Sequence, residues 1–103
     1  MRAVFWSSDA LHDLNSVIAY IATENPQAAL DVINKIEAAG NALGEMATGR
    51  KGRVSGTYEK VVAGLPYIMA YALEQRRDGA ERVMILRVIH GARDWKEGDW
   101  PKG

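Results

Sequence analysis

The amino-acid sequence predicts an α+β fold: an N-terminal strand and an antiparallel helix hairpin packed on one face of an antiparallel sheet of three to four strands. Two observations support this prediction. Apolar residues recur at helical spacing through two consecutive segments within residues 9–46, and short β-branched and aromatic runs separated by turn residues occupy residues 57–90. Each helix has a single apolar stripe, so both must lie on the same face of the sheet. The 103 residues are expected to form one domain, 1–103.

The first helix follows a short strand predicted at residues 2–6. Ser7, Ser8 and Asp9 suit the start of a helix, because Ser side chains cap its free N–H groups and a carboxylate is favourable in its first turn. The helix then extends to about Thr23. Its apolar stripe recurs at i, i+3, i+7 and i+10 and consists of Leu11, Leu14, Ile18 and Ile21.

The second helix is predicted at roughly residues 26–46. Asn25 is a good N-cap, and Pro26 is favoured at the first helical position. The connection between the helices is so short that they should form an antiparallel hairpin. Gly40 costs about 1 kcal/mol inside a helix, so close packing against a neighbour is a plausible reason for its presence.

Three strands joined by short turns are predicted in the second half of the chain, at residues 57–63, 67–73 and 82–90. Gly64-Leu65-Pro66 forms a turn between the first two, and Asp78-Gly79 is a hairpin signal between the last two. Short turns connect antiparallel neighbours, so these strands should form a meander. The preceding stretch, "TGRKGRVSG", is predicted to be a basic loop that can contain a brief edge strand.

The last strand contains an arginine among aliphatic residues. Alternation places Met84, Leu86, Val88 and His90 on one face and Val83, Ile85, Arg87 and Ile89 on the other. An unpaired arginine beneath the helices would be costly, so the first set is assigned to the helix-covered core and the second set to the open face. The middle strand is also apolar on both faces. Exposed apolar patches usually mark a partner, so another polypeptide is expected to cover the second face.

Basic residues occur in two segments that could form one cationic site. They are Arg50, Lys51 and Arg53 in the loop, and Arg87, His90 and Arg93 around the end of the last strand. Guanidinium groups bind phosphates through paired hydrogen bonds, and histidine transfers protons near neutral pH. Such a site could hold RNA and cleave it by positioning a 2′-OH. The alternative, which spacing alone favours, is a solvated basic loop and a structural histidine.

Other polar and aromatic residues are assigned ordinary structural roles. His12-Asp13 falls on the polar side of the first helix and is expected to face solvent. Glu59 is expected to be a surface charge, and Tyr58 to cover the sheet edge rather than stack on a base. Trp95 and Trp100 are expected to anchor the C-terminal tail over the body of the protein, and the alternative is that they contact a partner.

Composition excludes several functional classes. Zero cysteines exclude disulfides and thiolate metal sites, and two histidines give little support to a metal centre, so no metal or cofactor is predicted. The absence of a membrane span and of a signal-peptide core fits a cytoplasmic protein. Residues 1–48 contain two basic and six acidic groups, whereas residues 49–103 contain eleven basic and seven acidic groups. This asymmetry fits either an anionic partner of the second half or a dipolar surface without a specific partner.

Three long stretches of the chain carry a family resemblance. They are "ALHDLNSVIAYIATENPQAALDVINKI", "GRKGRVSGTYEKVVAGLPYIMAYAL" and "ILRVIHGARDW", in this order. Together they resemble a RelE/ParE-type toxin of a type II toxin–antitoxin system over about residues 5–95. The fold of that family, two N-terminal helices against an antiparallel sheet, agrees with the layout predicted from periodicity.

The resemblance implies a small cytoplasmic bacterial toxin that a cognate antitoxin neutralises by wrapping an extended and helical segment around it. ParE-like members poison DNA gyrase, whereas RelE-like members cleave mRNA in the ribosome with Arg, Lys, His or Tyr side chains. The residues that could match such a metal-independent nuclease site are Arg50, Arg53, Arg87 and His90. Three departures favour the ParE-like branch. Gly91 stands where a catalytic Tyr is common, Tyr58 replaces a frequent Arg, and the net charge is zero although RNA binding favours positive charge.

We therefore predict a non-enzymatic, ParE-like toxin of a ParDE-like plasmid-stabilisation system that inhibits growth by poisoning DNA gyrase. The alternative is a RelE-like ribosome-dependent mRNA endonuclease, and a third is an inactive toxin that only binds its antitoxin. The predicted partners are a ParD-like ribbon-helix-helix antitoxin and gyrase, or alternatively the ribosome and mRNA, in a hetero-oligomeric complex without membrane contact. No catalytic residue is favoured. The surface predicted to bind antitoxin or target contains Val83, Ile85, Arg87, Ile89, Arg93 and Trp95.

Overall fold

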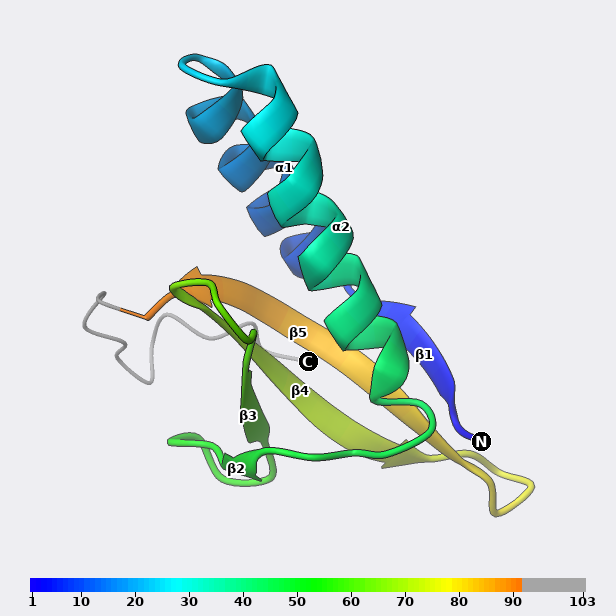
Figure 1. Cartoon of the computed structure of the whole chain (residues 1–103). Helices are drawn as coiled ribbons and strands as arrows, with labels where there is room; N and C mark the ends of the chain where they lie inside the picture. Colours follow the sequence, from blue (N-terminus) through cyan, green and yellow to red (C-terminus); the bar gives the residue numbers. More distant parts are fainter. Residues whose placement is uncertain (92–103) are drawn as a thin grey trace.

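The computed structural model describes residues 1–91 of the chain, which form an α+β fold as predicted (Figure 1). In chain order the elements are β1 (Ala3–Trp6), α1 (Ser8–Ala22), α2 (Pro26–Ala42), β2 (Arg50–Lys51), β3 (Tyr58–Val61), β4 (Tyr67–Gln75) and β5 (Glu81–His90). The two helices form a hairpin on one side of the sheet (Figure 1). Each predicted helix and strand occurs, although α2 ends at Ala42 rather than near residue 46.

The sheet has five strands in the order β1-β5-β4-β3-β2. The segment from β2 to β5 is the predicted antiparallel meander. β1 adds a parallel edge strand, in which Ala3 pairs with Arg82 and Trp6 pairs with Ile85. The sheet therefore exceeds the predicted three to four strands, because β1 pairs with a segment that is distant in sequence and no local turn indicates that pairing.

Both helices begin with the caps that the sequence indicates. The Ser7 hydroxyl accepts a hydrogen bond from the Ala10 N–H at 3.0 Å, and the Asn25 side chain accepts one from the Ala28 N–H at 3.1 Å. Pro26 occupies the start of α2. Neither helix within the described residues is long and apolar enough to cross a membrane.

Gly40 allows α2 to pack closely on the sheet. A Cβ atom at this position would lie 2.5 Å from the Trp6 ring and 2.8 Å from the Ile85 side chain. Such distances are shorter than real van der Waals contacts, so a larger residue would move the helix away from the sheet. Close packing is therefore a sufficient reason for a glycine in the middle of this helix.

The main core lies between the helix pair and the sheet. Its buried residues are Ala10, Leu14, Ile33, Ile36, Leu43, Val62, Tyr67, Met69, Tyr71, Val83, Ile85 and Val88. Tyr71 is the most voluminous of the fully buried side chains, and its hydroxyl donates a hydrogen bond to the Thr48 carbonyl at 2.7 Å. Its ring stacks on that of Tyr58 with 5.5 Å between the ring centroids. Tyr58 therefore packs against a core side chain of the neighbouring strand β4.

A β-bulge in β5 changes which of its side chains face the helices. On the neighbouring strand, Ala70 pairs with Arg87 and Tyr71 pairs with Ile85, so Leu86 is an extra residue without a partner in β4. The start of α1 bonds to the backbone here, because Ser7 donates its N–H to the Ile85 carbonyl and its hydroxyl to the Leu86 carbonyl, both at 2.9 Å. The bulge is thus held from the helix side.

The bulge makes the face assignment of the last strand wrong in large part. Val83 and Ile85 are fully buried in the core beneath the helices, whereas Met84 and Leu86 are only half-buried. Val88 does belong to the helix-covered core, as predicted. Strict alternation fails because the extra residue shifts the side-chain parity by one position along the strand.

The second face of the sheet carries a small apolar cluster. Ile68, Ala70 and Ile89 are buried there, and Val54 and Leu86 pack against them. Val54 belongs to the loop that follows β2, so the chain itself contributes to the cover of this face. The open patch expected from Val83, Ile85 and Ile89 therefore does not exist in that form, since the first two face the helices.

Candidate functional site

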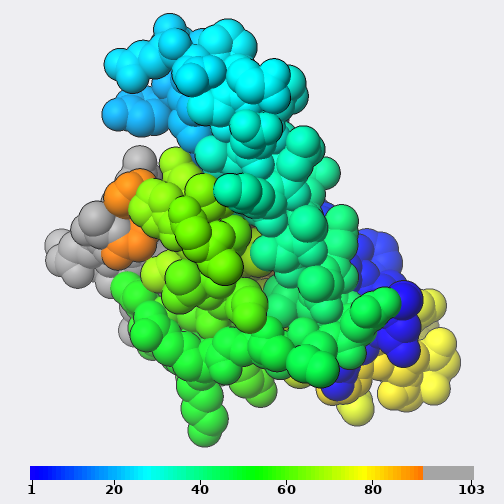
Figure 2. All heavy atoms as spheres, viewed as in Figure 1, coloured from blue at the N-terminus to red at the C-terminus, as the bar shows by residue number. Residues whose placement is uncertain are grey.

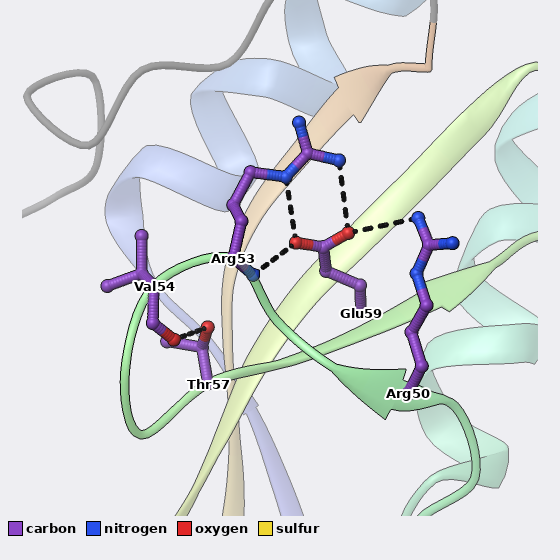
Figure 3. Close-up of polar contacts among 5 residues, drawn as sticks. All are labelled: Arg50, Arg53, Val54, Thr57 and Glu59. Carbon is purple, nitrogen blue, oxygen red and sulfur yellow. Dashed lines mark hydrogen bonds and ion pairs between the residues drawn. The ribbon is translucent and has the colours of Figure 1, made fainter.

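The loop between β2 and β3 surrounds a buried carboxylate with arginine donors (Figure 3). Glu59 is only 2% exposed. One of its oxygens, Oε2, accepts hydrogen bonds from the Arg53 backbone N–H at 2.9 Å and from Arg53 Nε at 3.0 Å. Oε1 accepts from Arg53 Nη2 at 3.2 Å and from Arg50 Nη2 at 3.3 Å. The expectation that Glu59 is a surface charge is wrong, because these donors offset the cost of burying it.

Glycine and threonine give this loop the shape that places Arg53 over Glu59. The Gly52 N–H donates to the Thr57 carbonyl at 2.8 Å, and a Cβ atom on Gly52 would collide with the Thr57 hydroxyl. The Thr57 hydroxyl donates to the Val54 carbonyl at 2.6 Å (Figure 3). These contacts turn the chain back onto β3 within a few residues, so the Arg53 backbone and side chain both meet the same carboxylate.

The electrostatics of Glu59 reflect a balance of opposing effects. Burial by itself raises the pKa of Glu59, because a charge is less stable away from water. The hydrogen bonds from the side chain and backbone of Arg53, the charge of Arg53, and the hydrogen bond from Arg50 act in the opposite direction and prevail. The pKa of Glu59 therefore lies below its ordinary value, and the side chain is a carboxylate at neutral pH.

A second carboxylate, Asp13 of α1, meets the edge of β5 beyond the end of β1. Arg87 donates to it from Nε at 2.7 Å and from Nη2 at 3.1 Å, and the backbone N–H of Val88 donates at 2.9 Å. The side chains of Arg87 and Asp13 are 22% and 13% exposed, so the ion pair is largely shielded from water. This paired arrangement is why β5 tolerates an arginine next to the helix layer.

A cavity of about 730 Å³ opens beside this ion pair, between α1 and the adjoining parts of β4 and β5. The end of the helix hairpin (blue to cyan) rises clear of the strands in Figure 2. The cavity is lined by His12, Asp13, Ser16, Val17, Tyr20, Tyr67, Arg87, Val88 and His90. The His90 ring meets the Tyr67 ring edge-on, with 5.6 Å between centroids. Such walls offer a ligand hydrogen bonding and aromatic contact.

The residues of the predicted cationic site separate into two groups. Arg50 and Arg53 share the Glu59 carboxylate, whereas Arg87 and His90 line the cavity next to α1. Neither Arg50 nor Arg53 is among the residues that line this cavity in the described part of the chain. Each of the three arginines already donates to a carboxylate.

The residues predicted to bind the antitoxin or target are also distributed differently from the prediction. Val83 and Ile85 are buried beneath the helices and cannot contribute to a binding surface without unfolding the core. Ile89 lies in the cluster on the second face, and Arg87 is paired with Asp13. Arg93 and Trp95 lie outside the described residues.

Sequence reasoning missed three residues that shape these sites: His12, Asp13 and Glu59. His12 and Asp13 are not simply solvated, because both line the cavity. Asp13 follows Ala10 by three positions and precedes Val17 by four, so helical spacing alone would have placed it at the border of the apolar stripe. For Glu59, the signal was the pair Arg50 and Arg53, which precede it by nine and six positions in a segment that folds back on the strand of Glu59. No group of three or more His, Asp or Glu side chains within residues 1–91 could hold a metal ion.

Comparison with known proteins places the chain among bacterial toxins. Residues 4–95 match a family described as "ParE toxin of type II toxin-antitoxin system, parDE". "Putative toxin Y4kP" of Sinorhizobium fredii (strain NBRC 101917 / NGR234) is 38% identical over 97 residues, which cover 93% of this chain and 95% of that protein.

Two solved structures share the fold. A chain of the chromosomal ParDE toxin–antitoxin system from P. aeruginosa superposes with a TM-score of 0.76 at 21% identity, over 87% of this chain and 96% of that chain. A chain of the toxin–antitoxin complex RelBE2 from Mycobacterium tuberculosis gives a TM-score of 0.55 at 24% identity, over 89% and 93% of the two chains. The predicted RelE/ParE resemblance is thereby confirmed. The chain belongs to the ParE toxin family of type II toxin–antitoxin systems.

Proposed function

We propose that this ParE-family toxin arrests bacterial growth by poisoning DNA gyrase in the cytoplasm, and that a ParD-like ribbon-helix-helix antitoxin neutralises it. Family membership supports the toxin role, and the description of the family as part of parDE supports an antitoxin of the ParD kind. Toxin and antitoxin would form a hetero-oligomeric complex.

The observation that carries the choice of gyrase over RNA is the internal pairing of the arginines. A nuclease of this fold class needs cations that stabilise phosphate charge during cleavage. Here Arg50 and Arg53 donate to Glu59, and Arg87 donates to Asp13. Phosphate groups of RNA would have to compete with carboxylates that are already bonded at short distance. This arrangement disfavours RNA cleavage and favours a mechanism that depends on protein contact.

A ribosome-dependent mRNA endonuclease is the second candidate, and the cavity is the observation that favours it. Arg87, His90 and His12 line the same space, so one guanidinium and two imidazoles border a single cavity. A histidine in such a position could accept the proton of a 2′-OH. In this case His90 would be the residue whose loss abolishes cleavage.

Two assays run in parallel test the proposal. The purified chain is added to bacterial DNA gyrase with relaxed plasmid, and separately to ribosomes translating a defined mRNA. We expect loss of supercoiling with intact mRNA, and we expect His90→Ala to retain that inhibition. Cleaved mRNA together with normal supercoiling, abolished by His90→Ala, would establish the nuclease instead. Addition of the cognate antitoxin should restore supercoiling.

A further inference from the structure

The loop between β2 and β3 has the geometry of an oxyanion-binding site. Four donors converge on two oxygens: the Arg53 backbone N–H, two nitrogens of the Arg53 guanidinium, and one nitrogen of Arg50, at 2.9 to 3.3 Å. A guanidinium fork combined with a backbone N–H is how proteins bind phosphate and carboxylate groups. In this chain the anion that fills the site is the side chain of Glu59.

The donors are far more accessible than the anion that they hold. The side chains of Arg50 and Arg53 are 65% and 38% exposed, whereas that of Glu59 is 2% exposed. Glu59 rises from β3 between the two arginines (Figure 3). An anion arriving from solvent would therefore meet the arginines directly, but it would have to occupy the position of the Glu59 carboxylate to use all four donors.

The charges indicate what would happen without Glu59. Two guanidinium groups and one carboxylate leave a net charge of +1 on the cluster, so removing the carboxylate leaves +2 on groups that already converge. Two like charges held this close repel each other, and a free anion that binds between them relieves the repulsion. A phosphate oxyanion matches both the charge and the spacing of paired donors.

We propose that this loop is a phosphate-type oxyanion site that the chain occupies with its own Glu59, and that Glu59 thereby prevents phosphate groups, including those of a nucleic-acid backbone, from binding there. The site is defined by Arg50, Arg53 and the Arg53 backbone N–H. Its existence does not depend on gyrase as the cellular target, so the two proposals can fail separately.

Glu59→Ala tests the proposal in the full-length chain, because it removes the carboxylate and leaves a space of similar size. Thermal unfolding is followed by circular dichroism in increasing inorganic phosphate, with sodium chloride at matched ionic strength as the reference. We expect phosphate to raise the Tm of Glu59→Ala and to bind it roughly tenfold or more tightly than it binds the unsubstituted chain. If the variant is unfolded in chloride, we expect phosphate to restore its helical signal.

Two control variants separate site binding from general salt effects. Phosphate stabilises many proteins by exclusion from their surfaces, and Ile36→Val, a core change that alters no charge, reports that background. Glu59→Ala combined with Arg53→Ala removes the main donor residue and should lose the additional stabilisation. The proposal is overturned if phosphate affects Glu59→Ala no more than Ile36→Val, if the effect persists in the double variant, or if an unfolded Glu59→Ala stays unfolded in phosphate.

A second experiment tests whether the site binds only inorganic phosphate or also the phosphate groups of a nucleic-acid backbone. A fluorescently labelled single-stranded RNA is titrated with the Glu59→Ala and unsubstituted chains at constant salt, with anisotropy as the signal. Tighter RNA binding by Glu59→Ala would show that the site accepts a nucleic-acid backbone. Phosphate binding without tighter RNA binding would support the oxyanion site and overturn the claim that Glu59 excludes nucleic acid.

Discussion

At the scale of single residues, the polar chemistry of this toxin depends on pairing charges with partners that alternation cannot reveal. Arg87 donates to an aspartate 74 positions earlier in the chain, and Arg53 donates to a glutamate on the next strand. Both arginines looked available for phosphate in the sequence. The structure assigns each of them to a carboxylate, and this pairing divides a predicted cationic site into a neutral Arg87–Asp13 pair and a cluster of net charge +1 around Glu59.

Glu59 should make the free energy of unfolding decrease at acidic pH. The pKa of Glu59 is lowered in the folded state. The ionised side chain therefore contributes fully to the free energy of unfolding above its ordinary pKa near 4.5, and this contribution is lost as the pH falls through the lower pKa of the folded state. We expect Glu59→Gln to lower the free energy of unfolding by about 2–3 kcal/mol at pH 7, since it removes a buried ion-pair partner. Urea unfolding at pH 7 and pH 3 measures this.

The difference between Glu59→Gln and the unsubstituted chain should shrink towards pH 3. Glu24→Gln is the matched control, because Glu24 is an exposed carboxylate and its loss should change stability little. An equal effect of Glu59→Gln at both pH values would contradict the assigned pKa shift.

Tyr71 should make the free energy of unfolding decrease at alkaline pH. Burial, and to a lesser extent Tyr58, raises the pKa of Tyr71 above its ordinary value of 10.0, although Arg2 acts in the other direction. The unfolded chain then loses the phenolic proton first, so stability falls as the pH rises above 10. We expect Tyr71→Phe to cost about 1–2 kcal/mol at pH 7, through loss of the bond to Thr48, and to reduce the alkaline loss of stability. Tyr20→Phe, at a position 80% exposed, should show neither effect in chemical unfolding.

At the scale of elements, contact between α1 and the bulge in β5 decides how the last strand presents its side chains. Periodicity was sufficient to place both helices, and turn residues were sufficient to place β3, β4 and β5. The faces of β5 could not be predicted, because one unpaired residue, Leu86, reverses the parity and depends on bonds from Ser7 and Asp13. Sequence alternation contains no information about that long-range contact.

Asp13→Asn should loosen this junction without unfolding the sheet. The neutral amide can no longer offset the Arg87 charge or accept as strongly from the Val88 N–H. We expect hydrogen exchange of the Val88 amide to become about tenfold faster, the factor that corresponds to 1.4 kcal/mol, with little change in the segment of β5 between β1 and β4. Equal acceleration along the whole of β5 would show that the junction is not a local unit.

Gly40→Ala tests the packing of α2 on the sheet. Helix propensity favours alanine by about 1 kcal/mol, but the new methyl group would collide with Trp6 and Ile85. We expect a net loss of about 1–3 kcal/mol from overpacking, measured by urea unfolding. Glu37→Ala, on the exposed side of the same helix, reports propensity alone and should be nearly neutral. A stabilised Gly40→Ala would rule out close packing as the reason for the glycine.

At the scale of the whole molecule, the family of the chain could be identified from the order of its motifs. Fold class and family were both predictable, because periodicity and the order of motifs are properties of the chain itself. The burial of individual residues in β5 was not predictable, because it depends on which side of the strand faces the helices. Val83 and Ile85 show this clearly, since they were assigned to a docking surface and are core residues.

We propose that this ParE-family toxin acts on DNA topology and does not cleave RNA. The most direct test of this claim is the linking number of a reporter plasmid in bacteria after the toxin is induced, resolved on chloroquine gels beside the integrity of a cellular mRNA. We expect growth arrest with relaxed plasmid while the mRNA is still intact, and reversal by the cognate antitoxin. Growth arrest with normal supercoiling and cleaved mRNA would contradict the claim.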